Sequence, residues 1–376
     1  MHVSTPSIPF RMPASTRFAR VLPAILFVLL AAPLLRAGET DGGKREPKRP
    51  RIARLLEAGR TAVGERYVWS DELVFHDWRI RKNWLTDEHW VISPDGERVT
   101  NGTFQQCQAS LEIIKKRESL PRMSGKMVLL LHGLGESRKS LQSMSDFLKN
   151  SGGYNVAAVV YPGMYGEIGE YAESLDRILQ NLDGVEEVYL VSHSLGSLVV
   201  RHYWQDQTDP TVGLAPDARI KRIVMISPIN NGSGFGRILD SPQLLESFLG
   251  EAGQELSKTW QDFSRKLATP SCEFGVIANG KEDIADKPDE PISEVDRLNI
   301  EMAKLPGASD FVVTNGGHFL QPASKTVQAY TINFLRHGYF ISADQRHPLP
   351  ALDKQAVSPA ADADKPALLD VPRLAP

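Results

Sequence analysis

Ser194 stands in a frame of small residues, within the stretch VYLVSHSLGSLVV at residues 188–200. Ser192 lies just before it and Gly196 just after it, each with one residue between. Small residues around a nucleophile allow a tight turn from a strand into a helix, which presents the serine side chain at the top of a sheet. The usual pattern is Gly-x-Ser-x-Gly, so Ser192 departs from it. The segment predicts either a nucleophilic serine or an ordinary loop in which a serine caps a helix.

A nucleophilic serine needs a base to remove its proton, and histidine is the side chain best suited to this near neutral pH. When the serine stands on such a turn, the acid and then the histidine follow it along the chain. His202 falls within the helix expected after the turn, His337 follows the last helical pattern, and His347 lies in the tail. His318 follows the final apolar strand through two glycines, in FVVTNGGHFLQP, and is the predicted base.

The third member of such a site is a carboxylate that orients the imidazole and stabilises the imidazolium. It should lie between the strand that ends at Ala278 and the predicted base. The aspartates of this segment are Asp283, Asp286, Asp289, Asp296 and Asp310. Asp283 is nearest to the end of the strand, whereas Asp296 precedes RLNIEMAKLPGASDFVV, which leads into the final strand. The residues alone leave this choice open.

A glycine-rich turn follows the first strong apolar strand, in LLLHGLGES at residues 129–137. Attack by a serine on an acyl carbon puts negative charge on the carbonyl oxygen, which fixed backbone N–H groups must stabilise. The backbone N–H groups of Leu134 and Leu195 are the predicted donors. The alternatives are an ordinary turn or a phosphate-binding loop, but the Lys-Ser/Thr pair that a phosphate loop needs is missing.

Short apolar runs alternate with longer helical patterns between residues 126 and 314. The expected strands are residues 126–131, 155–160, 187–192, 221–227, 273–278 and 310–314. Continuous Val, Ile and Leu runs are typical of parallel strands covered by helices on both faces. Helical patterns include residues 169–182 and 195–206. The alternation predicts an α/β fold with a doubly wound, mostly parallel sheet, in which ligands bind beyond the carboxyl ends of the strands.

Before residue 126, apolar and polar residues alternate in two segments, and this pattern predicts further β-strands. LVFHDWRI (residues 73–80) and HWVISPDGERV (89–99) are typical of a β-hairpin, and residues 104–118 of a helix. We interpret these elements as an N-terminal extension of the same sheet.

Cys107 and Cys272 could pair in an exported protein or remain free, and their spacing predicts no metal site.

Six motifs together resemble the α/β-hydrolase superfamily, specifically its small bacterial lipase- and esterase-like members. The resemblance covers roughly residues 65–340 and includes DWRIRKNWLT, LLLHGLGES, VSHSLGSLVVRHY, SPINNGSGFG, CEFGVIANGKED and LPGASDFVVTNGGHF. It implies the α/β-hydrolase fold. It also implies that Ser194 is the nucleophile, His318 the base, and Leu134 and Leu195 the oxyanion-hole positions.

The acid segment departs from the family, whose members tend to have Asp-Gly-x-Val ahead of an RLPG-like stretch. Counting back from KLPG, Asp296 is the nearest aspartate, and we select it as the acid. Asp289 fits an Asp-x-x-Ile pattern but needs an insertion after it, and Asp283 is the other alternative.

The resemblance implies a serine hydrolase that cleaves carboxylic esters through an acyl-enzyme, with a small-molecule or lipid ester as substrate and no cofactor. An amidase or thioesterase with the same machinery is one alternative. A non-catalytic binding domain on a hydrolase fold is another. The sequence leaves the acyl chain and the oligomeric state open.

The ends of the chain suggest export. Arg11, Arg17 and Arg20 precede the apolar run 21–35, so residues 1–37 are predicted to be a signal peptide or an N-terminal membrane anchor. The protein is therefore expected in the periplasm or outside the cell. A net charge of −3 over 376 residues, with no basic stripe, gives no reason to expect nucleic-acid binding.

The remaining boundaries follow from composition. We expect a linker at residues 38–60, the hydrolase domain at 61–342, and a disordered Pro- and Ala-rich tail at 343–376. A cap insertion is expected at 230–270, either as two helices that pack on the core or as a mobile apolar lid.

Overall fold

The computed structural model describes residues 68–84, 86–162, 167–211, 214–231, 266–281 and 292–351. Its centre is a six-stranded sheet of order β10-β9-β8-β7-β5-β6, and every neighbouring pair is parallel. The strands are β5 (Lys126–Leu131), β6 (Asn155–Val159), β7 (Glu187–His193), β8 (Ile220–Ile226), β9 (Glu273–Asn279) and β10 (Asp310–Thr314). The predicted α/β fold with a parallel sheet is confirmed.

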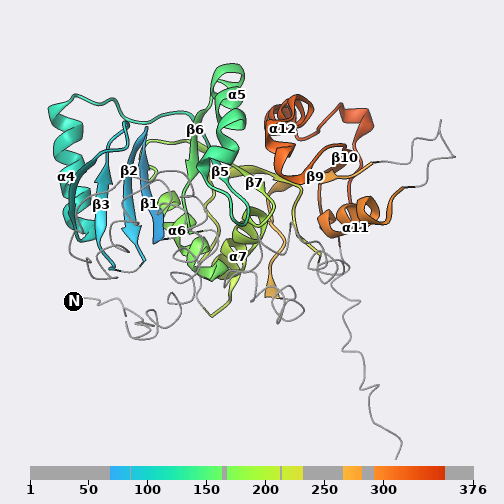
Figure 1. Ribbon diagram of the computed structural model, residues 1–376, viewed down its shortest axis with the longest axis horizontal. Helices are drawn as coiled ribbons and strands as arrows, with labels where there is room; N and C mark the ends of the chain where they lie inside the picture. The colour runs from blue at the N-terminus through green and yellow to red at the C-terminus, as the bar shows by residue number, and fades with distance from the viewer. Residues whose placement is uncertain are drawn as a thin grey trace, which may run out of the picture.

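Helices cover both faces of this sheet (Figure 1). They are α5 (Gln142–Gly152) and α12 (Lys325–His337) above it in that view, and α6 (Ile168–Gln180) and α7 (Gly196–Thr208) below it. Alternate residues of one strand therefore point into different cores. Leu129 and Leu131 pack with the core of α6 and α7, whereas Val128 and Leu130 pack with that of α5 and α12. Burial on both faces explains the continuous apolar runs.

A second sheet lies beside the first, at the left in Figure 1. It is antiparallel and consists of β1 (Trp69–Phe75), β2 (Trp78–Asn83), β3 (His89–Ile92) and β4 (Arg98–Gly102), with helix α4 (Phe104–Arg117) next to it. The expectation that these residues extend the main sheet is wrong. The Asp71 backbone N–H donates to the carbonyl of Val160, but the Asp71 carboxylate accepts the Val160 N–H in return. The Asp71 carboxylate thus replaces a backbone carbonyl as the acceptor of the Val160 N–H, and the backbone hydrogen bonds between the two sheets do not continue.

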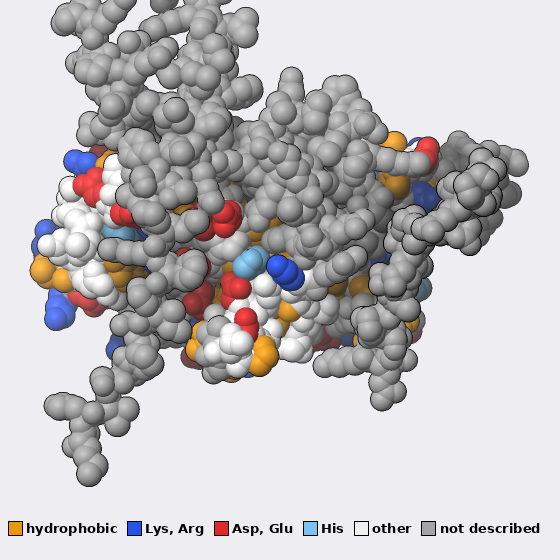
Figure 2. Space-filling view, turned by 90° about the horizontal axis from the view of Figure 1, so that it is seen from below, with side chains coloured by type: hydrophobic (Ala, Val, Ile, Leu, Met, Phe, Trp, Pro, Cys, Tyr) orange, Lys and Arg blue, Asp and Glu red, His pale blue; other side chains and the backbone are white. Residues whose placement is uncertain are grey.

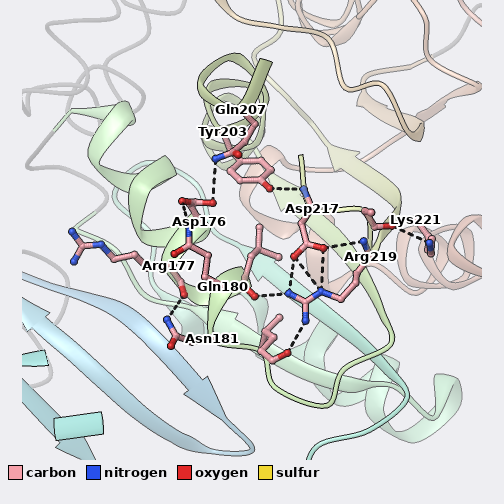
Figure 3. Close-up of polar contacts among 12 residues, drawn as sticks. Asp176, Arg177, Gln180, Asn181, Tyr203, Gln207, Asp217, Arg219 and Lys221 are labelled. Carbon is pink, nitrogen blue, oxygen red and sulfur yellow. Dashed lines mark hydrogen bonds and ion pairs between the residues drawn. The ribbon is translucent and has the colours of Figure 1, made fainter. Parts of the chain in front are cut away.

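A network of hydrogen bonds joins α6 and α7 to the loop before β8, the strand that neighbours β7 (Figure 3). Arg219 donates to both carboxylate oxygens of Asp217 and to the carbonyls of Leu179 and Leu182 at the end of α6. The backbone N–H of Asp217 donates to the Tyr203 hydroxyl of α7 at 2.9 Å. The loop before β8 is therefore fixed to both helices.

The described part of the lower face carries carboxylates among basic, apolar and other side chains (Figure 2). Burial raises the pKa of Asp176 on α6, and the nearby Asp206 and Asp217 carboxylates raise it further, against the opposing effect of Arg177. Gln180 and Gln207 donate side-chain hydrogen bonds to its two carboxylate oxygens.

The C-terminal boundary of the domain needs a correction. A disordered tail is expected from residue 343, but residues 343–351 are described, and hydrogen bonds join them to the edge strand β10 and the loop before it. The buried Asp310 carboxylate accepts the backbone N–H groups of Phe340 and His347, and Leu349 pairs with Ala308 at 2.9 Å. These bonds extend the ordered domain.

Other expectations fall outside the described residues: the export segment and linker of residues 1–60, most of the cap at 230–270, and the tail beyond residue 351. None of the helices in the described part of the chain is long and apolar enough to cross a membrane. Cys107 and Cys272 are both free thiols.

Candidate active site

Ser194 occupies a sharp turn between β7 and α7. Its φ angle is +51°, a left-handed conformation that a residue with a side chain rarely adopts. Its backbone N–H donates to the carbonyl of Ile226 at 3.0 Å, which fixes the turn to β8. A Cβ on Gly196 would lie 2.6 Å from the carbonyl oxygen of Leu131, so α7 can start this close to β5 only at a glycine. The strain at Ser194 is therefore held by its surroundings.

The departure from the usual pattern at Ser192 is accommodated without disturbing the turn. The side chain is fully buried, and its Oγ lies 2.9 Å from the Oγ of Ser197 in the first turn of α7. A buried hydroxyl with such a partner carries no unpaired polar atom.

His318 meets Ser194 from the opposite side of the site. Its Nε2 lies 3.0 Å from the serine Oγ, and the loop that delivers it contains Gly316 at φ +147°. Burial lowers the pKa of His318, the positive charge of His193 lowers it further, and Glu136 partly offsets both, which leaves the pKa at about 3. The imidazole is therefore neutral near pH 7 and can accept a proton from the serine.

The turn after β5 packs directly on the serine. A Cβ on Gly133 would lie 3.0 Å from Oε2 of Glu136 and 3.1 Å from the Cβ of Ser194, so any other residue here would force these neighbours to shift by a few tenths of an ångström. Leu134 and Leu195 are both buried, and within the described residues their backbone N–H groups donate to no protein acceptor. Both groups are available to a ligand atom.

Stacked aromatic rings pack against the turn that follows β5. The Tyr161 hydroxyl donates to the backbone carbonyl of His132, and the two rings stack with centroids 4.1 Å apart. Tyr171 also stacks with Tyr161, with ring centroids 5.0 Å apart. Burial raises the pKa of Tyr161 well above its usual value, so its hydroxyl remains a donor.

The structure does not bring Asp296 to His318. Asp296 lies in the first turn of α11 (Glu294–Ala303), where its carboxylate accepts the Ser293 hydroxyl at 2.7 Å. Ser293 Oγ in turn accepts the Asp296 backbone N–H at 3.0 Å, an arrangement that caps the helix. Asp310 is committed to the backbone of the C-terminal segment, as described above. Asp283, Asp286 and Asp289 lie outside the described residues.

Two further side chains belong to the site although sequence reasoning did not select them. One oxygen of Glu136, Oε2, accepts the Gly133 N–H at 2.7 Å, Nδ1 of His193 at 2.9 Å and the Ser140 hydroxyl at 3.2 Å. Burial raises the pKa of Glu136, but the hydrogen bond and charge of His193 and the Gly133 N–H outweigh it and lower the pKa to about 2. The available signal was positional: one residue lies inside HGLGES and the other directly precedes the serine.

Two exposed apolar side chains lie next to the histidine of the site. Phe319 and Leu320 directly follow the histidine, and they are 46% and 69% exposed.

In the part of the chain that the structure describes, no group of three or more His, Cys, Asp and Glu side chains is arranged to hold a metal ion. The chemistry that this geometry can perform is proton transfer from a serine to a histidine beside free backbone donors.

Comparison with known proteins identifies one matching family and several similar solved structures. The model of the Alpha/beta hydrolase family matches residues 128–329. Among solved structures, the chain is similar to a gene product of Listeria innocua, at 15% identity over 58% of this chain and 95% of that chain, with a TM-score of 0.37. It is also similar to a lipase-esterase related protein from Clostridium acetobutylicum, at 13% identity over 59% of this chain and 96% of that chain, with a TM-score of 0.33.

A third similar structure is tomato methylketone synthase I in complex with 2-tridecanone, at 16% identity over 58% of this chain and 100% of that chain, with a TM-score of 0.35. None of the curated proteins matches this sequence. The family match, in contrast, spans more than half of the chain and includes both the serine turn and His318. The chain belongs to the alpha/beta hydrolase family.

Proposed function

We propose that this protein is an exported serine hydrolase that cleaves carboxylic esters through an acyl-enzyme. The observation that carries the proposal is the 3.0 Å approach of His318 Nε2 to Ser194 Oγ, on a turn held at φ +51°. A serine hydroxyl is a weak nucleophile unless an adjacent base takes its proton. A neutral imidazole within hydrogen-bond reach supplies that base.

The first half of the reaction forms the acyl-enzyme. Ser194 Oγ attacks the ester carbonyl carbon while its proton passes to His318 Nε2. The negative charge that develops on the carbonyl oxygen is stabilised by the N–H groups of Leu134 and Leu195. When the C–O bond to the alcohol breaks, His318 returns the proton to the leaving oxygen, and the acyl group remains on the serine.

The second half repeats these steps with water. His318 takes a proton from a water molecule, the hydroxide attacks the acyl carbon, and the acid leaves as Ser194 regains its proton. An aspartate would orient the imidazole, and the candidates remain Asp296, Asp289 and Asp283. The reaction needs no cofactor.

The apolar side chains beside the base support an apolar ester as substrate. Phe319 and Leu320 are largely exposed immediately after His318, where they could contact the acyl or the alcohol part of a bound ester. The apolar run 21–35 supports export. An amide or thioester could undergo the same steps, so the substrate assay has to include all three.

Labelling with a fluorophosphonate tests the proposal directly, because this probe reacts with activated serines. We expect the purified protein to be labelled at Ser194, as identified by mass spectrometry of the peptides. Ser194→Ala should abolish labelling and lower kcat for p-nitrophenyl butyrate by orders of magnitude, with unchanged circular dichroism. Absence of labelling in the folded wild-type protein would favour a non-catalytic binding domain. Turnover of an amide or thioester alone would assign one of those classes.

A further inference from the structure

The side chains of Glu136 and His193 form a pair that connects the turn carrying Leu134 with the backbone of His318. Glu136 follows the turn after β5, and His193 is the last residue of β7. Both side chains are buried, the His193 ring completely. On one side Glu136 accepts the N–H of Gly133, which precedes Leu134. On the other side Nε2 of His193 faces the backbone carbonyl oxygen of His318 at 3.1 Å.

These partners define the protons that His193 carries. A carbonyl oxygen can only accept, so Nε2 must hold a proton to bond to His318. Nδ1 faces an oxygen of Glu136 that already accepts the Gly133 N–H, so Nδ1 donates to it when Glu136 is ionised. With both nitrogens protonated, His193 is an imidazolium. The unit is then a buried ion pair in which both ring nitrogens of His193 and Oε2 of Glu136 have hydrogen-bond partners, and such partners help a charged pair to persist in a protein interior.

The positive charge stands next to the base. The rings of His193 and His318 lie 5.0 Å apart between centroids. A like charge at this distance opposes protonation of His318, which must be neutral to accept the serine proton. The other charged and titratable groups that face the pair are His132, directly after β5, Tyr161, after β6, and His318 on the short helix η4 (His318–Ala323).

We propose that Glu136 and His193 are positioning residues of this hydrolase: they form a carboxylate–imidazolium pair that ties the oxyanion turn to the backbone of His318 and keeps the base neutral. The inference rests on the proposed function for its kinetic consequences, whereas the state of the pair can be measured without substrate. A positioning error of about 1 Å can cost on the order of 10²-fold in rate, so a small displacement of His318 is measurable.

Two substitutions at His193 separate its two bonds. In His193→Gln the amide nitrogen reaches about as far as Nε2, so it can still donate to the carbonyl of His318. In His193→Asn the amide nitrogen corresponds to Nδ1, so it can reach Glu136 but leaves that carbonyl without this donor. Neither variant carries the positive charge.

We expect kcat for p-nitrophenyl butyrate to fall by about 10²-fold in His193→Asn but by less than about 10-fold in His193→Gln, with KM little changed in both. Both should move the acid limb of the kcat/KM profile to higher pH, because loss of a nearby cation raises the pKa of the base. His202→Gln is the matched control. It removes another histidine–carboxylate contact, to Asp206 at 3.0 Å on α7, and should leave kcat and the pH profile unchanged. Equal kcat in all three variants, or an unmoved acid limb, would overturn the proposal.

Histidine ¹⁵N resonances of the wild-type protein test the pair independently of any variant or activity. We expect both nitrogens of His193 to be protonated at pH 7, and the ring to become a neutral tautomer in Glu136→Gln. A neutral His193 in the wild-type protein contradicts the inference. This result is distinct from failure of the proposed function, which would appear as absence of fluorophosphonate labelling at Ser194.

Discussion

Nε2 of His318 lies 3.0 Å from Oγ of Ser194, although 124 positions separate the two residues along the chain. The serine follows β7, in the middle of the parallel sheet, and the histidine follows β10 at its edge. The carboxyl ends of parallel strands lie at one edge of the sheet, so loops from distant strands can meet there. The approach of these two atoms is thus a consequence of strand direction and strand order.

The titration of His318 should make the protein less stable in mild acid. The pKa of His318 is lowered from 6.5 to about 3 by burial and by His193, with Glu136 opposing. Between these values the unfolded state binds more protons than the folded state, so stability falls as the pH drops. The slope should be below about 1.4 kcal/mol per pH unit, because the ring is only half-buried.

Urea unfolding at pH 7, 6 and 5 measures this slope. His318→Asn should flatten it, since the substituted side chain does not titrate in this range. An equal slope in the variant would assign the acid sensitivity to other groups.

The parts of the fold that the sequence predicts are those encoded by local pattern. Strands buried on both faces appear as uninterrupted apolar runs, which is why six of them were located to within a residue or two at each end. The serine turn has its own local signature, and His318 is marked by its place after the final strand. Each of these features can be seen in a short window of residues.

Features that depend on long-range contacts were not predictable in this way. The separate antiparallel sheet follows from the Asp71 carboxylate meeting Val160, 89 positions away. The packing of residues 343–351 depends on the buried Asp310 carboxylate. Glu136 resembles any surface acid in a turn until Gly133, Ser140 and His193 are seen to converge on one of its oxygens.

The Tyr161 hydroxyl should stabilise the turn that carries Leu134. Tyr161→Phe removes the donor to the His132 carbonyl but keeps the stacked ring. Loss of a buried hydrogen-bond partner costs about 1–3 kcal/mol, so we expect a corresponding drop in the free energy of unfolding. A looser turn should also lower kcat by about 10-fold with little change in KM. Tyr189→Phe is the control, because its hydroxyl bonds to Glu187 at the opposite end of β7. Equal kcat in the two variants would contradict the role of Tyr161.

Export predicts a processed N-terminus. If residues 1–37 are a cleaved signal, mass spectrometry of the protein recovered from its native host should find a mature chain that begins near Gly38. An intact N-terminus in the membrane fraction would instead identify residues 21–35 as an anchor. A soluble, unprocessed chain in the cytoplasm would contradict both forms of the proposal.

The acid of the proposed triad should be identifiable by three matched substitutions, Asp283→Asn, Asp289→Asn and Asp296→Asn. The Asp296 carboxylate is bound to the Ser293 hydroxyl at the start of α11, where it also benefits from the positive end of the helix dipole. Asp296→Asn should therefore cost some stability and change kcat by less than about 10-fold, because an Asn side chain preserves much of a cap.

A triad aspartate behaves differently. Its replacement by Asn leaves the imidazole in the wrong tautomer and lowers kcat on the order of 10⁴-fold. We expect a loss of this size at either Asp283 or Asp289, measured on a short-chain ester with the fold checked by thermal unfolding. A collapse of kcat in Asp296→Asn alone would mean that α11 rearranges in the working enzyme to release Asp296 from Ser293. Near wild-type kcat in all three variants would mean that His318 works without any of these carboxylates. Among the described residues, the charge of Glu136 favours the His318 imidazolium and would then be the remaining candidate to stabilise it.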